Sequence, residues 1–236
     1  MSEGGFDKTR WTLVNNFKTA DEKTRKRALE ELCQIYWCPL YAWLRRSGKS
    51  REDASDLVQG FFAHILGHDY LERADPGRGK LRTWLLTLLR SYANDVYKHG
   101  SAEKRGGMAQ FTWIDAQEGE FTLVGATEGD PESRFDRDWA QAVYDRALGR
   151  LEARYQRSEA HVAQFSRLSP LLGEDSDQRL QKVAIELNMT HGAVRVALHR
   201  MRQRFRGLLR EEVADTILPE DDLDQEIRYL AQVLVP

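Results

Sequence analysis

Apolar residues recur at three- and four-residue steps through most of this chain, and this spacing constrains the fold more than any other feature. One stripe covers residues 29–44, a second covers residues 54–65 and a third covers residues 81–92. The same period resumes near residue 139. Because a 3.6-residue period places these side chains on one helix face, it predicts amphipathic helices. No convincing strand pattern is present, so the predicted fold class is all-α.

Local signals place two helix boundaries. Ser50 precedes the second stripe, and Asp53 lies three residues after Ser50. This spacing is a variant of the capping box. Pro39 interrupts the first stripe, so we expect a kink or a new helix start near Cys38.

The period is lost between residues 100 and 137, where six glycines and Pro131 punctuate the chain. Such a composition is typical of a connecting segment, so we predict two small helical domains joined by a flexible linker. The predicted organisation is a first domain at 8–100, the linker at 101–137, a second domain at 138–212 and an acidic tail at 213–236.

Composition narrows the class of protein. Charged residues make up 31% of the chain, and no apolar run approaches the roughly 20 residues that span a bilayer. The first residues lack the apolar stretch of a secretory signal, so we expect a cytoplasmic protein with no membrane insertion. Cys33 and Cys38 are the only cysteines and are expected to be buried thiols, with no metal site and no cofactor. No nucleophile pairs with the six histidines and no phosphate-binding loop is present, so we expect no enzymatic activity.

Charge is unevenly spread along a chain whose formal net charge is only −2. Residues 78–105 carry seven basic and two acidic side chains, and residues 190–210 carry six arginines and no acid. Each basic block precedes an acidic one: residues 115–138 have a net charge of −6 and residues 211–228 one of −7. Two basic blocks suggest two sites for a polyanion.

The second basic block lies in a predicted helix-turn-helix. A short helix at 178–188 is followed by a turn in which Asn188 is able to adopt a left-handed conformation. Thr190 is then expected to cap a second helix at 190–210. This layout places the second helix as a recognition helix for DNA.

The second helix carries its cations away from its apolar stripe. Arg195 is the best candidate for a bidentate contact to guanine, with Thr190, His191 and His199 on or near the same side. The residues Arg200, Arg202 and Arg204 are expected to bind phosphates. The alternatives are a solvated basic helix, or a basic amphipathic helix that binds a membrane or a calmodulin-like partner.

Three motifs in order carry a family resemblance. They are "DASDLVQGFFAHIL" at 53–66, "GKLRTWLLTLLRSYANDVYK" at 79–98 and the terminal helix-turn-helix. Together they resemble the extracytoplasmic-function (ECF) sigma factors of bacterial RNA polymerase, and "TRWTLV" near the start resembles one large-chain branch of that family. Gly60 stands where the family usually has an acid.

The resemblance implies an alternative sigma factor that binds core RNA polymerase and directs promoter recognition. The helix from Asp53 would contact core polymerase through Asp53, Asp56, Leu57 and Gln59. The alternative for the two acids is that they only favour the helix N-terminus, by roughly 0.3–1 kcal/mol each.

The resemblance also assigns the two basic blocks to promoter DNA. The first domain would resemble sigma region 2 and bind the minus-ten element through Arg73, Arg78, Lys80, Arg82, Arg90 and Ser91. The second would resemble region 4 and bind the minus-thirty-five element with the recognition helix. An anti-sigma factor or other regulator is a further partner that the resemblance allows.

Two other function classes stay open at this point. One is a stand-alone helix-turn-helix regulator whose amino-terminal domain senses a ligand or dimerises. The other is an interaction protein in which a sigma-like fold sequesters a partner. Mixing the chain with sigma-free core polymerase separates these classes.

Overall fold

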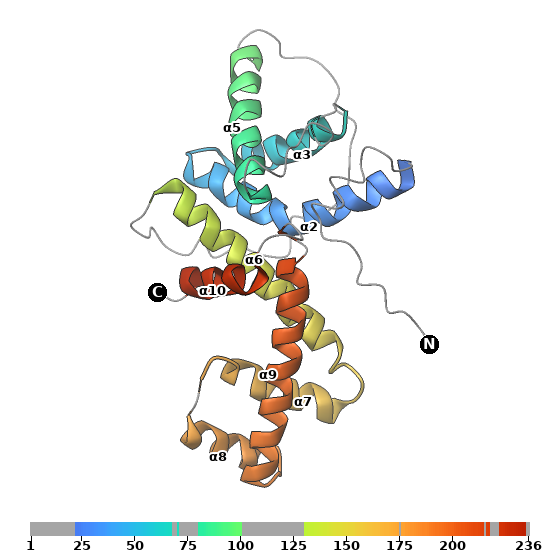
Figure 1. The fold of residues 1–236 in the computed structure, drawn as a ribbon, viewed down its shortest axis with the longest axis vertical. Helices are drawn as coiled ribbons and strands as arrows, with labels where there is room; N and C mark the ends of the chain where they lie inside the picture. Colours follow the sequence, from blue (N-terminus) through green and yellow to red (C-terminus); the bar gives the residue numbers. More distant parts are fainter. Residues whose placement is uncertain are drawn as a thin grey trace. The chain divides into compact units, whose positions relative to one another are not determined.

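The computed structural model describes residues 22–67, 70, 80–100, 130–174, 176–214, 216–217 and 222–234. Over these ranges the chain forms helices and no strand, which confirms the all-α prediction (Figure 1). The chain divides into two compact units, one of residues 1–142 with 214–236, and one of residues 143–213. The boundaries predicted for the domains stay a prediction. Residues 131–137, assigned to the linker, belong to helix α6.

The first unit contains α2 (Glu22–Arg46), α3 (Arg51–Gly67) and α5 (Leu81–Gly100), which pack against one another. It also contains the first part of α6 (Pro131–Ala153), up to Ala142, and α10 (Leu223–Leu234). The apolar stripes of α2, α3 and α5 contribute much of the core of this unit. They include Leu32, Ile35, Tyr36 and Leu40 from α2, Val58, Phe61 and Ile65 from α3, and Leu81, Leu85 and Leu89 from α5.

Local chemistry sets the ends of these helices. Ser50 caps α3 as predicted, since its Oγ accepts from the Asp53 amide at 3.0 Å; the Asp53 carboxylate accepts in turn from the Ser50 hydroxyl at 2.7 Å. Helix α2 ends where Gly48 adopts a φ of 85° and the Lys49 amide donates back to the Leu44 carbonyl at 3.2 Å.

Of the two outcomes expected near Cys38, a kink or a new helix start, the new start is wrong. Helix α2 runs unbroken through Pro39, which itself is buried. Tyr36 and Leu40 on either side are fully buried, so tertiary packing compensates for the hydrogen bond that proline cannot donate. Neither Cys33 nor Cys38 on this helix is in a disulfide, and both are partly buried.

The second unit contains the remainder of α6, α7 (Glu159–Leu168), η2 (Ser169–Leu171), α8 (Asp177–Glu186) and α9 (His191–Ala214) as far as Val213. One apolar cluster joins them, and it includes Leu151, Tyr155, Leu168, Val183, Val194, Leu198, Met201 and Phe205. The core stripe expected for the recognition helix is therefore buried as predicted.

No helix within the described ranges is both long and apolar enough to cross a bilayer.

Candidate nucleic-acid interface

Helices α8 and α9 follow one another across a short turn, at the place where the helix-turn-helix is predicted (Figure 1). Asn188 adopts a φ of 50°, and the Met189 amide donates back to the Ala184 carbonyl at 2.9 Å. Asn tolerates this left-handed conformation better than most residues, so it closes α8 and reverses the chain. Thr190 then caps α9, because its Oγ1 accepts from the Ala193 amide at 3.2 Å.

The predicted base-reading side chains lie on the outer surface of α9. Thr190, Arg195 and His199 are exposed, and His191 is half-buried. The His191 Nε2 lies 3.5 Å from Asp177 Oδ1 on α8, across the turn of the motif. The amino-terminal turns of α9 thus offer both donors and a cation to an incoming ligand, which is the arrangement that major-groove recognition requires.

The predicted phosphate-binding arginines differ in their surroundings. Arg200 and Arg204 are exposed, and Arg204 also donates to the Tyr155 hydroxyl at 3.3 Å. Arg202 is half-buried and donates to two backbone carbonyls, those of Leu171 (2.9 Å) and Glu174. Arg202 therefore ties α9 to the segment before α8, and a phosphate would compete with these carbonyls for its guanidinium.

Two acidic residues near the C-terminal end of α9, Glu211 and Glu212, bind arginines of α6. Glu212 is buried and accepts from Arg146 and Arg150 of α6, each at 2.9 Å, while Glu211 accepts from Arg150 at 2.6 Å. Two carboxylates hold the pKa of Arg150 above its ordinary value, although desolvation acts in the opposite direction. These acids are committed to holding α9 on α6, so they do not neutralise the cations at its other end.

The helix predicted to contact core polymerase presents three polar side chains. Asp53, Asp56 and Gln59 are exposed on α3, and Leu57 is partly buried. Asp53 also takes part in the Ser50 cap, so its carboxylate has a structural role beside any external one. Asp56 and Gln59 lie three residues apart and so occupy one face of the helix.

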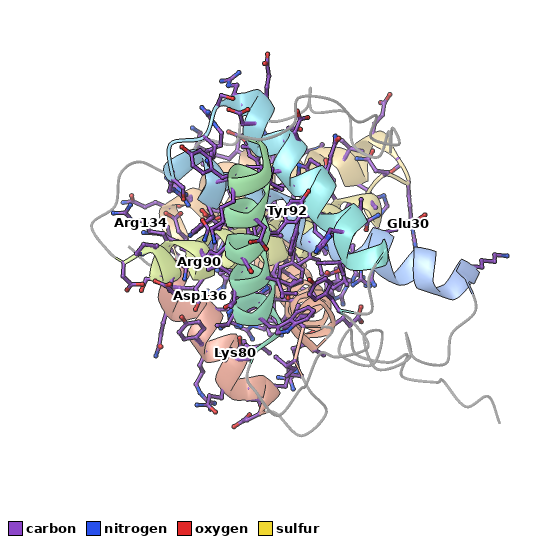
Figure 2. All side chains as sticks on the ribbon, turned by 90° about the horizontal axis from the view of Figure 1, so that it is seen from above. Glu30, Lys80, Arg90, Tyr92, Arg134 and Asp136 are labelled. Carbon is purple, nitrogen blue, oxygen red and sulfur yellow. The ribbon has the colours of Figure 1, made fainter. Side chains whose placement is uncertain are left out.

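The predicted minus-ten residues divide into three groups. Arg73 and Arg78 lie outside the described residues. Lys80 and Arg82 lie at the start of α5, and Arg90 and Ser91 lie farther along it, with Lys80 and Arg90 marked in Figure 2. Arg82 is only 3% exposed, Arg90 is half-buried, and Ser91 is exposed.

Arg82 lies at the centre of a buried charge network. Its Nε donates to Asp136 Oδ1 of α6 at 2.8 Å, and its Nη1 donates to Glu226 Oε1 of α10. The guanidinium also covers the Trp139 ring, at 4.2 Å from the ring centroid. Burial lowers the pKa of Arg82, but the charges and hydrogen bonds of Asp136 and Glu226 outweigh it and raise that pKa above its ordinary value.

Two further side chains extend this network. Lys80 donates to Glu226 Oε2 at 2.7 Å, and its ammonium lies 4.6 Å from the Tyr229 ring centroid. The Tyr229 hydroxyl donates to Asp136 Oδ2. Burial, followed by the bond to the Asp136 carboxylate, raises the pKa of Tyr229 to about 12, so the phenol stays protonated at neutral pH.

Farther along α5, Arg90 pairs with Glu132 of α6 and lies over the Trp43 ring, 5.1 Å from its centroid. Ser91 lines a hollow between α3 and α5 together with Phe61, His64, Tyr70, Tyr92 and Asp95. Its lining combines hydroxyl, imidazole and carboxylate groups with aromatic rings.

Reasoning from the sequence missed the partners of Lys80 and Arg82, which are Asp136, Glu226 and Tyr229. The only signal was the pair of acidic blocks, which contain the two carboxylates. Within the described residues, no group of three or more metal-binding side chains is present.

Comparison with known families bears on the first unit. Residues 28–102 match the family described as Sigma-70 region 2. This segment is therefore similar to sigma-70 region 2. The region 2 match supports a member of the sigma-70 family, with a role in binding RNA polymerase and recognising promoters. No curated protein and no solved structure matches the chain significantly.

The region 2 segment contains most of α2 and all of α3 and α5. Both the predicted polymerase-binding face and the described minus-ten residues therefore lie inside it. The helix-turn-helix lies outside the matched residues, so its assignment depends on its own geometry.

Proposed function

We propose that this chain is an alternative sigma factor of the ECF type, which binds core RNA polymerase and directs promoter recognition and transcription initiation. The observation that carries the proposal is the region 2 match at 28–102, followed in the same chain by a predicted helix-turn-helix whose second helix has no acid up to Arg210. A stand-alone regulator needs the second feature but not the first.

In this proposal α3 contacts core polymerase. Asp56 and Gln59 are exposed neighbours on one face and would donate or accept hydrogen bonds with the partner. Leu57 is partly buried and would add apolar contact, and Asp53 would contribute charge while it caps the helix.

The two basic surfaces bind promoter DNA. The recognition helix α9 enters the major groove of the minus-thirty-five element, with Arg195 reading a base and Arg200 and Arg204 binding phosphates. The minus-ten element is bound by the α5 edge, which consists of Lys80, Arg82 and Arg90, and by Arg73 and Arg78. Ser91 lines the hollow between α3 and α5. Opened DNA needs a place for an unstacked base and cations along the backbone.

The chain adds specificity, whereas polymerisation belongs to the polymerase. The proposal therefore involves no enzymatic activity and no cofactor of this chain, and it places the protein in the cytoplasm with the transcription machinery. An anti-sigma factor or other regulator is compatible with the exposed faces of α3 and α9.

The test is transcription with purified sigma-free core polymerase and a library of genomic fragments. We expect the chain to form a complex with the core and to direct transcription from a defined subset of fragments. Replacing Asp56 and Gln59 together by arginine should abolish both, whereas Glu152→Arg, at an exposed position of α6, should change neither. Specific duplex binding without any polymerase complex would contradict the proposal and favour the stand-alone regulator.

A further inference from the structure

One apolar side chain interrupts the polar surface of the recognition helix. Val196 is 50% exposed, whereas the core residues Val194, Leu198 and Met201 are buried. At 100° per residue, Val196 lies roughly 170° from the centre of that core stripe, so it is on the outermost line of the helix. It is therefore not part of the core of this unit.

The neighbours of Val196 are the residues that face DNA in the proposed function. One helical turn separates it from Gly192 before it and from Arg200 after it, and His199 lies beside it on the same face. Helical side chains lean toward the N-terminus, so the Val196 methyls lie over Gly192. Nothing lies within 4 Å of the position that a Gly192 side chain would take, so a flat group has open access to them.

The chemistry of the major groove says what this apolar spot fits. Thymine is the base that places a methyl group at the groove surface, and apolar side chains contact that methyl. We propose that Val196 reads the C5-methyl of a thymine in the minus-thirty-five element, adjacent to the base that Arg195 reads. This inference rests on the proposed function and names a specificity residue for it.

Deoxyuridine tests the proposal because it differs from thymine only by that methyl. The duplex that the full-length chain prefers is first identified by selection. Each thymidine of that duplex is then replaced in turn by deoxyuridine. At one position we expect the replacement to weaken binding about threefold to fivefold, the value of one buried methyl. Val196→Ala, which removes the two γ-methyl groups, should discriminate less between the thymine and deoxyuridine duplexes there, and Val162→Ala, at an exposed position of α7, should discriminate like the unchanged chain.

If Val196→Ala keeps the discrimination of the unchanged chain, or if the unchanged chain discriminates at no position, the proposal is wrong. Transcription with core polymerase separates this failure from failure of the proposed function. A chain that initiates transcription but ignores the methyl overturns only the role of Val196. A chain that initiates no transcription overturns both.

An independent observation concerns helix α10 and the cations that it binds. Glu226 of α10 binds Lys80 and Arg82 with its two carboxylate oxygens, and Asp136 of α6 binds Arg82 from another direction. Glu132 pairs with Arg90. All three described cations predicted to bind the minus-ten element are thus paired with carboxylates.

The pairing differs from incidental surface contacts in its burial. Arg82 and Glu226 are 3% and 5% exposed, and Leu230 on the same helix is also buried. Asp222 caps α10, since its Oδ1 accepts from the Asp224 and Gln225 amides at 2.9 and 3.1 Å. The acidic helix is therefore anchored both by its apolar face and by its charge.

We infer that α10 competes with the minus-ten strand for Lys80 and Arg82, so that DNA binding by this edge requires α10 to leave it. A phosphate and the Glu226 carboxylate are both anionic acceptors, and one guanidinium cannot give the same donor to both. This inference also rests on the proposed function.

The test compares two isosteric changes on the same helix. Glu226→Gln removes a charge that binds Lys80 and Arg82, and Asp224→Asn removes an equal charge from an exposed position. Binding of a labelled single-stranded oligonucleotide carrying the minus-ten element, chosen from transcribed fragments, should strengthen at least threefold for Glu226→Gln and stay unchanged for Asp224→Asn. Equal strengthening by both changes would reduce the effect to general charge and overturn the inference, as would no strengthening by either.

Hydrogen exchange on the unchanged chain provides a measurement that does not depend on folding of a variant. Adding the oligonucleotide should speed the exchange of α10 amides and leave those of α2 unchanged. Slower or unaltered exchange in α10 would overturn the inference even where the oligonucleotide binds. A chain that fails to initiate transcription with core polymerase would instead remove the proposed function.

Discussion

Substituting Gly60 by alanine should destabilise the first unit, although glycine is a poor helix former. Gly60 lies inside α3 and is buried against α5. A Cβ at this position would lie 2.3 Å from the Tyr92 hydroxyl oxygen and 3.3 Å from Cζ of the same ring. The ring is flanked by Phe61 and His64, with centroids 6.0 and 5.1 Å away, so it has little freedom to move aside.

Two opposing terms set the magnitude. Alanine in place of glycine within a helix favours folding by about 1 kcal/mol. Forcing an extra carbon into a packed site costs about 1–3 kcal/mol. The net change in the free energy of unfolding for Gly60→Ala is therefore a loss of about 1 kcal/mol. Gly149 of α6 has nothing within 4 Å of its missing side chain, so Gly149→Ala isolates the first term and should stabilise by about 1 kcal/mol.

Tyr92→Phe supplies the matching half of a double-mutant cycle. It removes the oxygen that lies closest to the new Cβ, so Gly60→Ala should cost less in the Tyr92→Phe background than in the unchanged chain. The assay is urea unfolding of the full chain followed by far-ultraviolet circular dichroism, fitted with one transition for each compact unit. The reasoning is refuted if Gly60→Ala stabilises as much as Gly149→Ala and the Tyr92→Phe background makes no difference.

Three other predictions concern named side chains. Arg195→Ala should relax base preference at one position of the selected duplex, whereas Arg204→Ala should weaken all duplexes alike and reduce the salt slope by about 0.9, as titrations at several salt concentrations would measure. Thr190→Ala should lower the unfolding free energy of the second unit by about 1 kcal/mol, since α9 loses its cap; an unchanged urea midpoint would refute this. Burial, reinforced by the nearby Glu30 charge, raises the pKa of the Cys33 thiol from 9.0 to about 12, so the native thiol should resist alkylation at pH 8. The unfolded thiol ionises first, so this contribution to stability is present below pH 9.0 and is lost as pH rises toward about 12; unfolding of a Cys33→Ala variant at pH 8 and pH 10 checks the sign.

Local rules were sufficient for the helices and for the recognition motif. The Ser50 cap, the Asn188 turn and the Thr190 cap each depend on groups within three to five residues of one another, so their chemistry is readable in sequence order. The alternative of a new helix start at Pro39 was wrong because the tolerance of proline inside α2 depends on tertiary packing around it, which no local pattern encodes.

Such local rules could not predict which residues surround Lys80 and Arg82 at the start of α5. Arg82 binds Asp136, 54 residues away, and Glu226, 144 residues away. The sequence records that acidic blocks exist but not which cation each carboxylate meets, since many pairings are compatible with the same charges. The sequence shows that Lys80 and Arg82 are cations and predicts that they bind DNA. The structure adds that both cations are already paired with carboxylates.

The two basic surfaces therefore differ in what DNA must overcome to use them. On α9 the exposed arginines Arg195 and Arg200 pair with no carboxylate among the residues that the structure describes, so phosphate binding there releases counterions without displacing one of these carboxylates. On α5 each new phosphate contact to Arg82 must replace an existing bond to Glu226 or Asp136, and the gain is only the difference between two anionic acceptors. If the inferred competition holds, duplex recognition by α9 does not require release of α10, whereas binding of the opened strand does. The acidic helix then restricts the step that needs melted DNA and leaves the search for a promoter unimpeded.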